Sequence, residues 1–306
     1  MPLFETIILP LDGSEPSESA LPYAAALAEL TSAPIVVIHV LEEMRPVFDA
    51  HRGEVVWISP EQPRVELEAP ELLEEPIGRL RTAGLTVRPV LRLGDPAAEI
   101  LAEVERWRAP LTVMASHGRG ELERLLLGSV ADRIVREAPA PVLVVPAASP
   151  SEQPARVQFR TLLVPLDGTL FAEHALPAAM ALARLARAGL TLVRVVDTHK
   201  RLTGGDELEQ FEREAEVYLR QKAETLAGPS GRAILWQVLS GEPSQQLRRF
   251  ITARQPDLVV MVTRGRGGLG RWLLGSVAED LLTSRAAPLL LLRAQDDTSQ
   301  QPASEA

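Results

Sequence analysis

The chain has 306 residues, with 32 basic and 41 acidic side chains for a formal charge of −9, and it contains no cysteine. This length suits two ordinary domains. The acidic balance argues against nucleic acid or an anionic membrane as the main partner, and the lack of cysteine excludes disulfides and thiol catalysis. Met1 to Glu5 show no signal-peptide features and no apolar run could span a bilayer, so we expect a soluble cytoplasmic protein.

Strand-like and helix-like segments alternate from the N-terminus onward. Apolar runs predict buried strands, and helical spacing of apolar residues predicts the helices between them. The expected strands of the first half are 4–11, 34–40, 85–93, 111–115 and 141–145, and the expected helices are 20–30, 65–83, 95–107 and 129–137. Ser14 is the expected N-cap of the first helix, and Pro70 and Pro76 are expected to interrupt the second. Residues 42–64, which contain three prolines, are expected to form a long irregular loop.

The second half repeats this order, with strands expected near 160–166, 190–196, 232–239, 257–262 and 288–293 and a long helix over 207–226. The stretch 7–14 matches 162–169 at an offset of 155 residues, whereas later matches have an offset of 147, so the first copy holds eight extra residues between Val40 and Gly94. Such a repeat predicts two copies of one domain. We place these domains at 1–146 and 158–294, with a linker over 147–157 and a polar, disordered tail over 295–306.

Alternating strands and helices predict an α/β fold: two tandem Rossmann-like domains, each an open five-stranded parallel sheet with helices on both faces. In such sheets, ligands bind outside the carboxyl ends of the strands, at the switch point of strand order. Asp12, Val40 and the loop after the fourth strand all follow or end strands of the first copy, so they are expected to approach one ligand.

A glycine loop follows the fourth strand of each copy. Gly118, nine further residues and Gly128-Ser129 recur as Gly265, nine residues and Gly275-Ser276. Glycines let the backbone approach a phosphate, and the N–H groups of the following helix start point toward it. The alternative is that the glycines only turn the chain and the serines only cap helices. A Walker-type loop is excluded because its lysine motif is missing.

Side chains near these loops suit binding better than catalysis. His117 recurs as Arg264, and either could donate to a phosphate or remain a solvated loop residue. Asp12 and Asp167 could meet a ligand or satisfy backbone donors of their own turn. The remaining histidines form no metal-ligand pattern, and the repeat preserves no second carboxylate near the loops. An efficient ATPase is therefore not expected, although slow hydrolysis is left open.

These motifs resemble the universal stress protein family, in particular its tandem members and its ATP-binding branch. The resemblance covers nearly the whole chain outside the linker, the tail and residues 42–64. It implies that Asp12 and Asp167 meet the adenosine, that Val40 and Val195 lie against adenine, and that the final strands of the two domains pair within the chain. ATP is the implied ligand, and a divalent metal and a homodimer are left open. The implied ATP contacts of the first copy are Pro10, Asp12, Val40, Ala115, His117, Gly118, Gly128, Ser129 and Val130. Those of the second copy are Pro165, Asp167, Val195, Arg264, Gly265, Gly275, Ser276 and Val277.

The chain departs from the family pattern at the first glycine of the loop, which is Ala115 in one copy and Val262 in the other. Alanine adds one methyl group, whereas valine is bulky and disfavours a positive φ. The first site is therefore the better candidate for ATP binding. Two alternatives stay open: an interaction module of the same fold that binds no nucleotide, and, ranked last, an enzyme that cleaves the α–β phosphate bond, which would want a different loop after the first strand.

Overall fold

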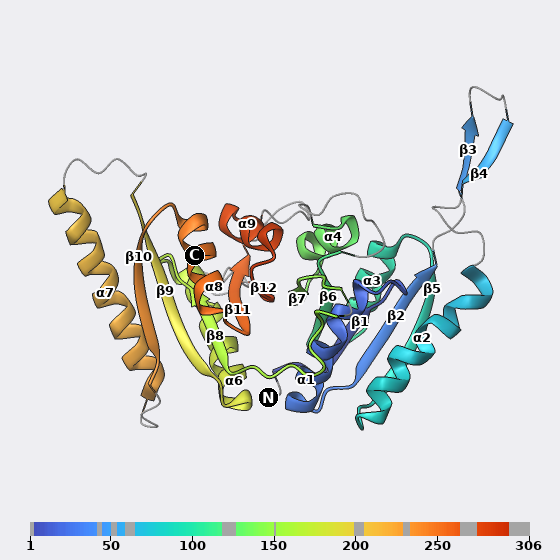
Figure 1. Ribbon diagram of the computed structural model, residues 1–306, viewed down its shortest axis with the longest axis horizontal. Helices are drawn as coiled ribbons and strands as arrows, with labels where there is room; N and C mark the ends of the chain where they lie inside the picture. Colours follow the sequence, from blue (N-terminus) through green and yellow to red (C-terminus); the bar gives the residue numbers. More distant parts are fainter. Residues whose placement is uncertain are drawn as a thin grey trace, which may run out of the picture. The chain divides into compact units, whose positions relative to one another are not determined.

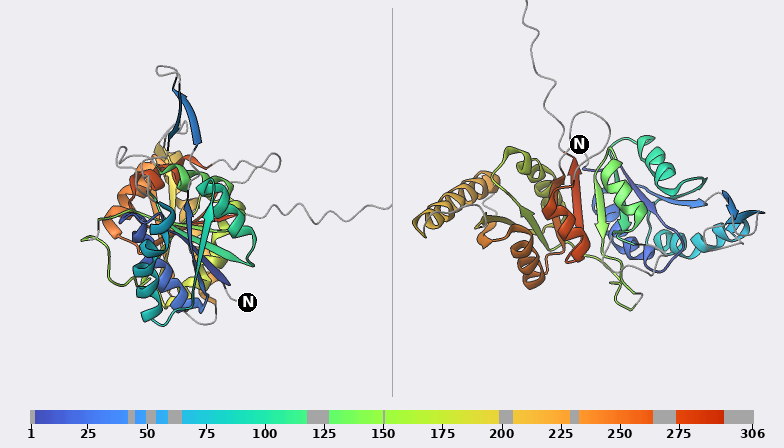
Figure 2. Two further views of the ribbon diagram at one scale, coloured as in Figure 1. Left: turned by 90° about the vertical axis from the view of Figure 1, so that its right-hand side faces the viewer. Right: turned by 90° about the horizontal axis from the view of Figure 1, so that it is seen from above.

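A computed structural model describes residues 3–41, 45–49, 54–58, 65–117, 127–149, 151–198, 205–228, 233–263 and 274–293. The chain divides into two compact units, Met1–Gln158 and Phe159–Ala306. Each unit contains a five-stranded parallel sheet with helices on both faces, which confirms the expected fold class (Figures 1 and 2).

In the first unit the strand order is β7-β6-β1-β2-β5. The chain leaves β1 in one direction through β2 to β5, and it returns to the other side of β1 for β6 and then β7, so the order reverses between β1 and β6. The strands are β1 (Thr6–Pro10), β2 (Ile35–Leu41), β5 (Val87–Leu93), β6 (Pro110–Ala115) and β7 (Val142–Val145), all paired in parallel.

The crossover helices of this unit complete two layers around the sheet. They are η1 (Ser17–Ala20), α1 (Leu21–Thr31), α2 (Val65–Thr82), α3 (Pro96–Glu105) and α4 (Ser129–Glu137). The first two α-helices contact each other, as do α3 and α4, and Figure 1 shows the two pairs on opposite faces. Because both faces are covered, the central strands are apolar at consecutive positions: Ile7, Ile8 and Leu9 are fully buried.

The second unit repeats this topology with the strand order β10-β9-β8-β11-β12. Its strands are β8 (Thr161–Pro165), β9 (Gly189–Asp197), β10 (Leu235–Gly241), β11 (Leu258–Thr263) and β12 (Leu289–Arg293), again parallel. Its helices are α5 (Leu170–Glu173), α6 (Ala175–Ala186), α7 (Gly205–Ala227), α8 (Pro243–Arg254) and α9 (Ser276–Ser284). The long helix expected over 207–226 is confirmed as α7.

Three local expectations were wrong. Residues 42–64 are not wholly irregular, because Arg45–Asp49 and Glu54–Ile58 form an antiparallel hairpin, β3–β4. Their β-branched and aromatic residues favour strands, and Pro46 is tolerated in a two-stranded ribbon where both strands are edges. Helix α2 runs unbroken past Pro76. Ser14 does not cap α1, since the 3-10 turn η1 intervenes and the residue preceding α1 is Ala20.

Candidate functional site

The strand order of the first unit reverses between β1 and β6, and we call the carboxyl ends of these two strands the first crevice. The β1–β2 ladder continues to Pro10↔Ile38, near the carboxyl end of β1. The β1–β6 ladder stops earlier, at Ile8↔Thr112, although β1 continues to Pro10 and β6 to Ala115. The two strands therefore separate toward their carboxyl ends, which is the position where open α/β sheets bind ligands.

Asp12 lies in the turn that leaves β1 at this crevice. Its Oδ1 accepts a hydrogen bond from the backbone N–H of Ser14 at 2.9 Å and another from the Ser14 hydroxyl at 2.6 Å. Gly13 between them has a φ of 77°, which a side chain would disfavour. The turn is also held from β2, where buried His39 donates through Nδ1 to the Leu11 carbonyl at 2.7 Å. Both readings of Asp12 are thus compatible with the geometry: it stabilises its own turn, and it lies where a ligand would bind.

The two ends of the first glycine loop meet at Ser116. The N–H of Gly128, just before α4, donates to the Ser116 carbonyl at 2.9 Å. A β-carbon on Gly128 would lie only 3.3 Å from that oxygen, so glycine permits this close approach. Gly118, within the loop, lies outside the described residues. The two ends of the loop are therefore joined at the carboxyl end of β6, and we call the bonded pair Ser116 and Gly128 the neck of the loop.

The start of α4 suits an anion. Helices α3, α5 and α8 are capped by the side chains of Asp95, Thr169 and Glu242. Helix α4 instead begins after Gly128, with no side-chain cap among the described residues, and its first intrahelical bond runs from Asp132 N–H to the Gly128 carbonyl at 2.8 Å. The amides of Ser129 and Val130 precede that bond, and N–H groups at such a position attract negative charge.

The second unit builds the same site at β8 and β11. The β8–β11 ladder stops at Leu163↔Val259, before either strand ends. Asp167 Oδ1 accepts from the Thr169 N–H at 2.9 Å and from its hydroxyl at 2.6 Å. Helix α9 likewise begins after a glycine, Gly275, without a side-chain cap among the described residues. Arg264 and Gly265 lie outside those residues.

The two sites differ in exposure and in charge. Asp12 is half-buried, whereas Asp167 is exposed. The position of His39 is taken by Arg194, whose guanidinium lies against Gly168 and stacks 5.1 Å from the centre of the Tyr218 ring. The second site therefore has a cation beside its aspartate turn, and the first has a buried imidazole bonded to the backbone.

Val262 does not carry the backbone cost expected from sequence. It lies within β11 and pairs with Leu292, and Ala115 lies within β6 and pairs with Val145. Neither residue has a positive φ. A β-branched side chain is well suited to extended backbone, so the remaining difference between the two positions is side-chain volume.

The other expected contact residues lie at the same carboxyl edges. Val40 and Val195 are half-buried and precede the last residues of β2 and β9. The last residues of β1 and β8 are Pro10 and Pro165, and His117 follows Ser116. The first turns of helices α4 and α9 contain Val130, Ser276 and Val277. The His117 Nδ1 lies 3.2 Å from the Ser116 hydroxyl oxygen.

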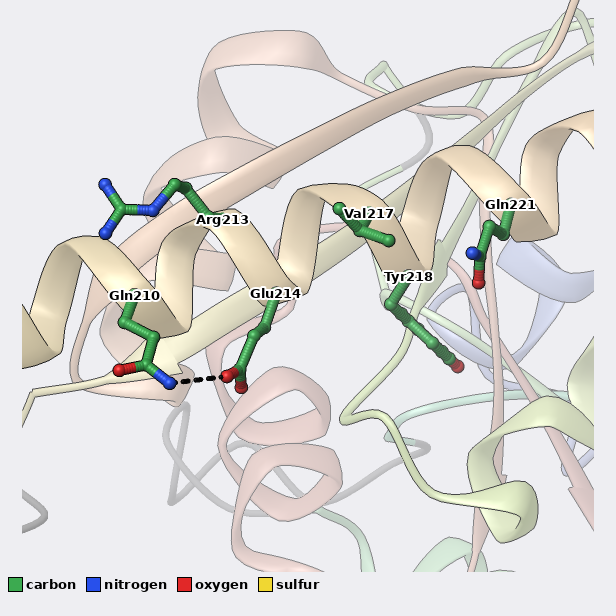
Figure 3. A pocket seen from close by; sticks show the side chains of 6 residues that line it. All are labelled: Gln210, Arg213, Glu214, Val217, Tyr218 and Gln221. Carbon is green, nitrogen blue, oxygen red and sulfur yellow. Dashed lines mark hydrogen bonds between the residues drawn. The ribbon is translucent and has the colours of Figure 1, made fainter.

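A pocket on one helix and the distribution of metal-ligand side chains bear on other kinds of site. A surface hollow of about 460 Å³ runs along α7, but one helix supplies all of its lining: Gln210, Arg213, Glu214, Val217, Tyr218 and Gln221 (Figure 3). In the described part of the chain, no group of three or more histidines and carboxylates could hold a metal, and no helix is long and apolar enough to cross a membrane.

Comparison with known proteins agrees with the repeat and the fold. The model of the universal stress protein family matches residues 3–146 and 158–293. The chain belongs to the universal stress protein family. Universal stress protein Rv2005c of Mycobacterium tuberculosis is 31% identical over 300 residues, covering 94% of this chain and 96% of that protein. Universal stress protein MJ0577 of Methanocaldococcus jannaschii is 30% identical over 155 residues, covering 47% of this chain and 95% of that protein.

A solved structure extends the comparison over both units. The crystal structure of a universal stress protein from Archaeoglobus fulgidus superposes with a TM-score of 0.69 at 20% identity, and it covers 94% of this chain and 98% of that one. At this identity the likeness concerns the fold alone. This member of the universal stress protein family therefore shares its tandem arrangement with both bacterial and archaeal relatives.

Sequence reasoning missed two residues at the sites. Ser116 closes the neck of the first loop, and Arg194 lies against the second aspartate turn. A signal for Ser116 was present, because its repeat partner at an offset of 147 is Thr263, also a hydroxyl residue. The Arg194 position had no such signal, since its partner in the first copy is His39.

Proposed function

We propose that this universal stress protein binds ATP at the crevice of its first unit and acts in a stress response or in signalling without efficient turnover. The observation that carries the proposal is the early end of the β1–β6 ladder, which opens the sheet between Asp12 and the neck of the glycine loop. Polar and apolar groups suited to different parts of a nucleotide surround that opening.

Each part of the nucleotide has a counterpart in the first unit. The uncapped amides of Ser129 and Val130 suit phosphate oxygens, together with the loop backbone around Gly118. The Asp12 carboxylate, which already accepts from Ser14 through Oδ1, suits ribose hydroxyls as an acceptor. Half-buried Val40 offers an apolar surface for the base. The second unit offers the same types of group through Asp167, Val195 and Ser276.

Efficient phosphoryl transfer needs a positioned water or nucleophile and, in most cases, a metal held by carboxylates. Among the described residues, no group of three or more histidines and carboxylates could hold such a metal, and the Asp12 Oδ1 already accepts from Ser14. We therefore propose a binding protein whose nucleotide changes the order of its loops and so its choice of partner.

The alternative function is that of an interaction module that binds no nucleotide. The observation that favours it is the replacement of the first loop glycine in both copies, by Ala115 and by Val262. Side-chain volume at this position would then exclude the phosphates from both loops.

The deciding experiment denatures the purified protein, identifies any released nucleotide by mass spectrometry, and measures binding of added ATP by calorimetry. We expect ATP, either released or bound on addition. The matched variants are Gly118→Val and Gly265→Val, of which the first should abolish binding at the better site while leaving the fold intact. Absence of ATP in both measurements would favour the interaction module, and full affinity in Gly118→Val would contradict the loop assignment.

A further inference from the structure

The linker predicted over 147–157 is bound to the rest of the first unit by several contacts. Just after β7, the Ala147 N–H donates to the Ser116 hydroxyl oxygen at 3.1 Å. The Ala148 N–H donates to the Ser19 hydroxyl oxygen at 3.0 Å, and Arg156 forms an ion pair with Glu29 on α1 at 2.9 Å. This linker is therefore an ordered part of the first unit along most of its length.

Ser116 connects this linker to the glycine loop. Its side chain is 2% exposed, and its three polar groups serve three different segments. The N–H donates to the Val145 carbonyl at 2.7 Å, the carbonyl accepts from Gly128 at the far end of the loop, and the hydroxyl oxygen accepts from Ala147 in the linker. A change in the position of Ser116 therefore affects both the neck of the loop and the first residue of the linker.

The linker also reaches the other ligand-facing segment, the turn that follows β1. Ser19 in η1 accepts from Ala148, and the Gln153 side chain donates to the Glu15 carbonyl at 3.0 Å. Glu15 and Ser19 lie just beyond the Asp12–Ser14 turn. The linker thus contacts both segments that border the crevice, without contributing a residue to the crevice itself.

We propose that Ser116 couples occupation of the first crevice to the hold of the first unit on the linker. This inference rests on the proposed function, because the occupant is ATP. A nucleotide bound beside Ser116 and the start of α4 holds Ser116 in place and strengthens the Ala147 hydrogen bond, so the linker opens less often. The coupling is reciprocal by thermodynamic necessity: a firmly held linker must raise the affinity for ATP by the same factor. ATP would in this way regulate the length of free chain between the two units.

The second unit contains the matched control. Thr263 occupies the position of Ser116, but its hydroxyl donates to the Leu292 carbonyl at 3.3 Å and accepts from Arg293 at 3.4 Å, both in β12. The variant Thr263→Ala therefore removes a buried hydroxyl at the end of the fourth strand of the second unit and leaves the linker contacts intact.

The test uses the single trypsin site of the linker, after Arg156, in the full chain. The rate of appearance of the fragment that begins at Val157 is measured by mass spectrometry with and without ATP, alongside ATP affinity by calorimetry. Cleavage of a native segment follows its opening equilibrium. We expect ATP to slow this cleavage by about fivefold or more in the wild type and in Thr263→Ala, a factor in the ordinary range of coupling between sites. In Ser116→Ala, cleavage without ATP should be faster and the protection by ATP should be lost.

A second variant, Gln153→Ala, loosens the linker at a half-exposed residue outside the crevice and should not disturb folding. Reciprocity requires that it weaken ATP binding by the same factor by which it reduces protection. If ATP binds to the wild type but leaves cleavage after Arg156 unchanged, or if Gln153→Ala speeds cleavage with unaltered affinity, the coupling is overturned while the proposed function stands. If the wild type does not bind ATP, both are overturned.

Discussion

At the scale of single residues, Asp12 stabilises its own turn and is the proposed partner of the ribose, and two measurements on one variant distinguish these roles. Asp12→Ala removes the acceptor for Ser14 N–H and hydroxyl, which should cost about 1 kcal/mol of unfolding free energy. It also removes the proposed partner of the ribose, so ATP affinity should fall about tenfold or more, as loss of a hydrogen bond to a charged group predicts. Urea denaturation and calorimetry measure the two effects.

Asp167→Ala is the matched control, because Asp167 makes the same two bonds to Thr169 in the second unit. Asp167→Ala should lower the unfolding free energy by a similar amount, but it should leave ATP affinity at the first, tighter site unchanged. Equal ATP affinity in Asp12→Ala and the wild type would show that Asp12 only stabilises its turn.

The repeat made several candidate site residues predictable from the sequence. Contacts that depend on the path of the chain in three dimensions could not be predicted in this way. Asp12 and Asp167 recur because both units need the same turn after their first strand. The sequence could not show that the Ser116 hydroxyl accepts from Ala147, because that contact depends on where the chain goes after β7. The expected strand over 257–262 already included Val262, so its extended backbone followed from the sequence, and the expected backbone cost came from the loop pattern alone.

At the scale of elements, every strand of the two sheets was predicted, because strands buried on both faces are continuous apolar runs. The hairpin β3–β4 was missed because the three prolines of residues 42–64, only one of them in the hairpin, outweighed short runs such as Val55 and Val56. Helix ends were less visible. Helices α1, α6 and α8 end at Ser32, Arg187 and Gln255 in left-handed conformation, where glycine would have been the usual sequence signal.

Helix α7 is anchored to α5 by a polar cluster that can be tested. The Tyr218 hydroxyl donates to Glu173 at 3.0 Å, and Lys222 forms an ion pair with the same carboxylate at 2.6 Å. Burial, with the nearby Glu173 charge, raises the pKa of the Tyr218 phenol. Tyr218→Phe should therefore reduce the unfolding free energy by about 1 kcal/mol near pH 8, measured by urea denaturation.

The pH dependence of this effect has a definite sign. Below the ordinary tyrosine pKa of about 10, the phenol is protonated in both folded and unfolded chains, so its bond contributes fully. Above that pH the unfolded chain ionises first, and the advantage of the wild type over Tyr218→Phe should shrink as pH rises. In a Glu173→Gln background, Tyr218→Phe should cost less at pH 8. An undiminished cost there would show that Glu173 is not the partner that matters.

At the scale of the whole molecule, the two copies of the domain have the same topology, and each has a crevice at the same position. Each unit reverses its strand order beside its first strand, ends one ladder early and begins an uncapped helix after a glycine. The units differ at positions that leave this plan intact: Ala115 against Val262, and His39 against Arg194. Because the strand order is shared, the effect of these two pairs of side chains on ligand binding can be tested by exchanging them.

A reciprocal exchange of the Ala115 and Val262 side chains tests that argument. Ala115 and Val262 both have extended backbone, so exchanging their side chains should change little in the folding of either strand. If volume alone makes the sites unequal, Ala115→Val should weaken ATP binding at the first site, and Val262→Ala should strengthen the second, each by about tenfold for a few ångströms of added or removed bulk. Calorimetry of the two single variants and the double exchange resolves this, because the double exchange should restore one tight and one weak site with their places reversed. If Val262→Ala instead leaves the second site weak, the cation beside its aspartate turn becomes the cause, and Arg194→His is the change that should then recover binding.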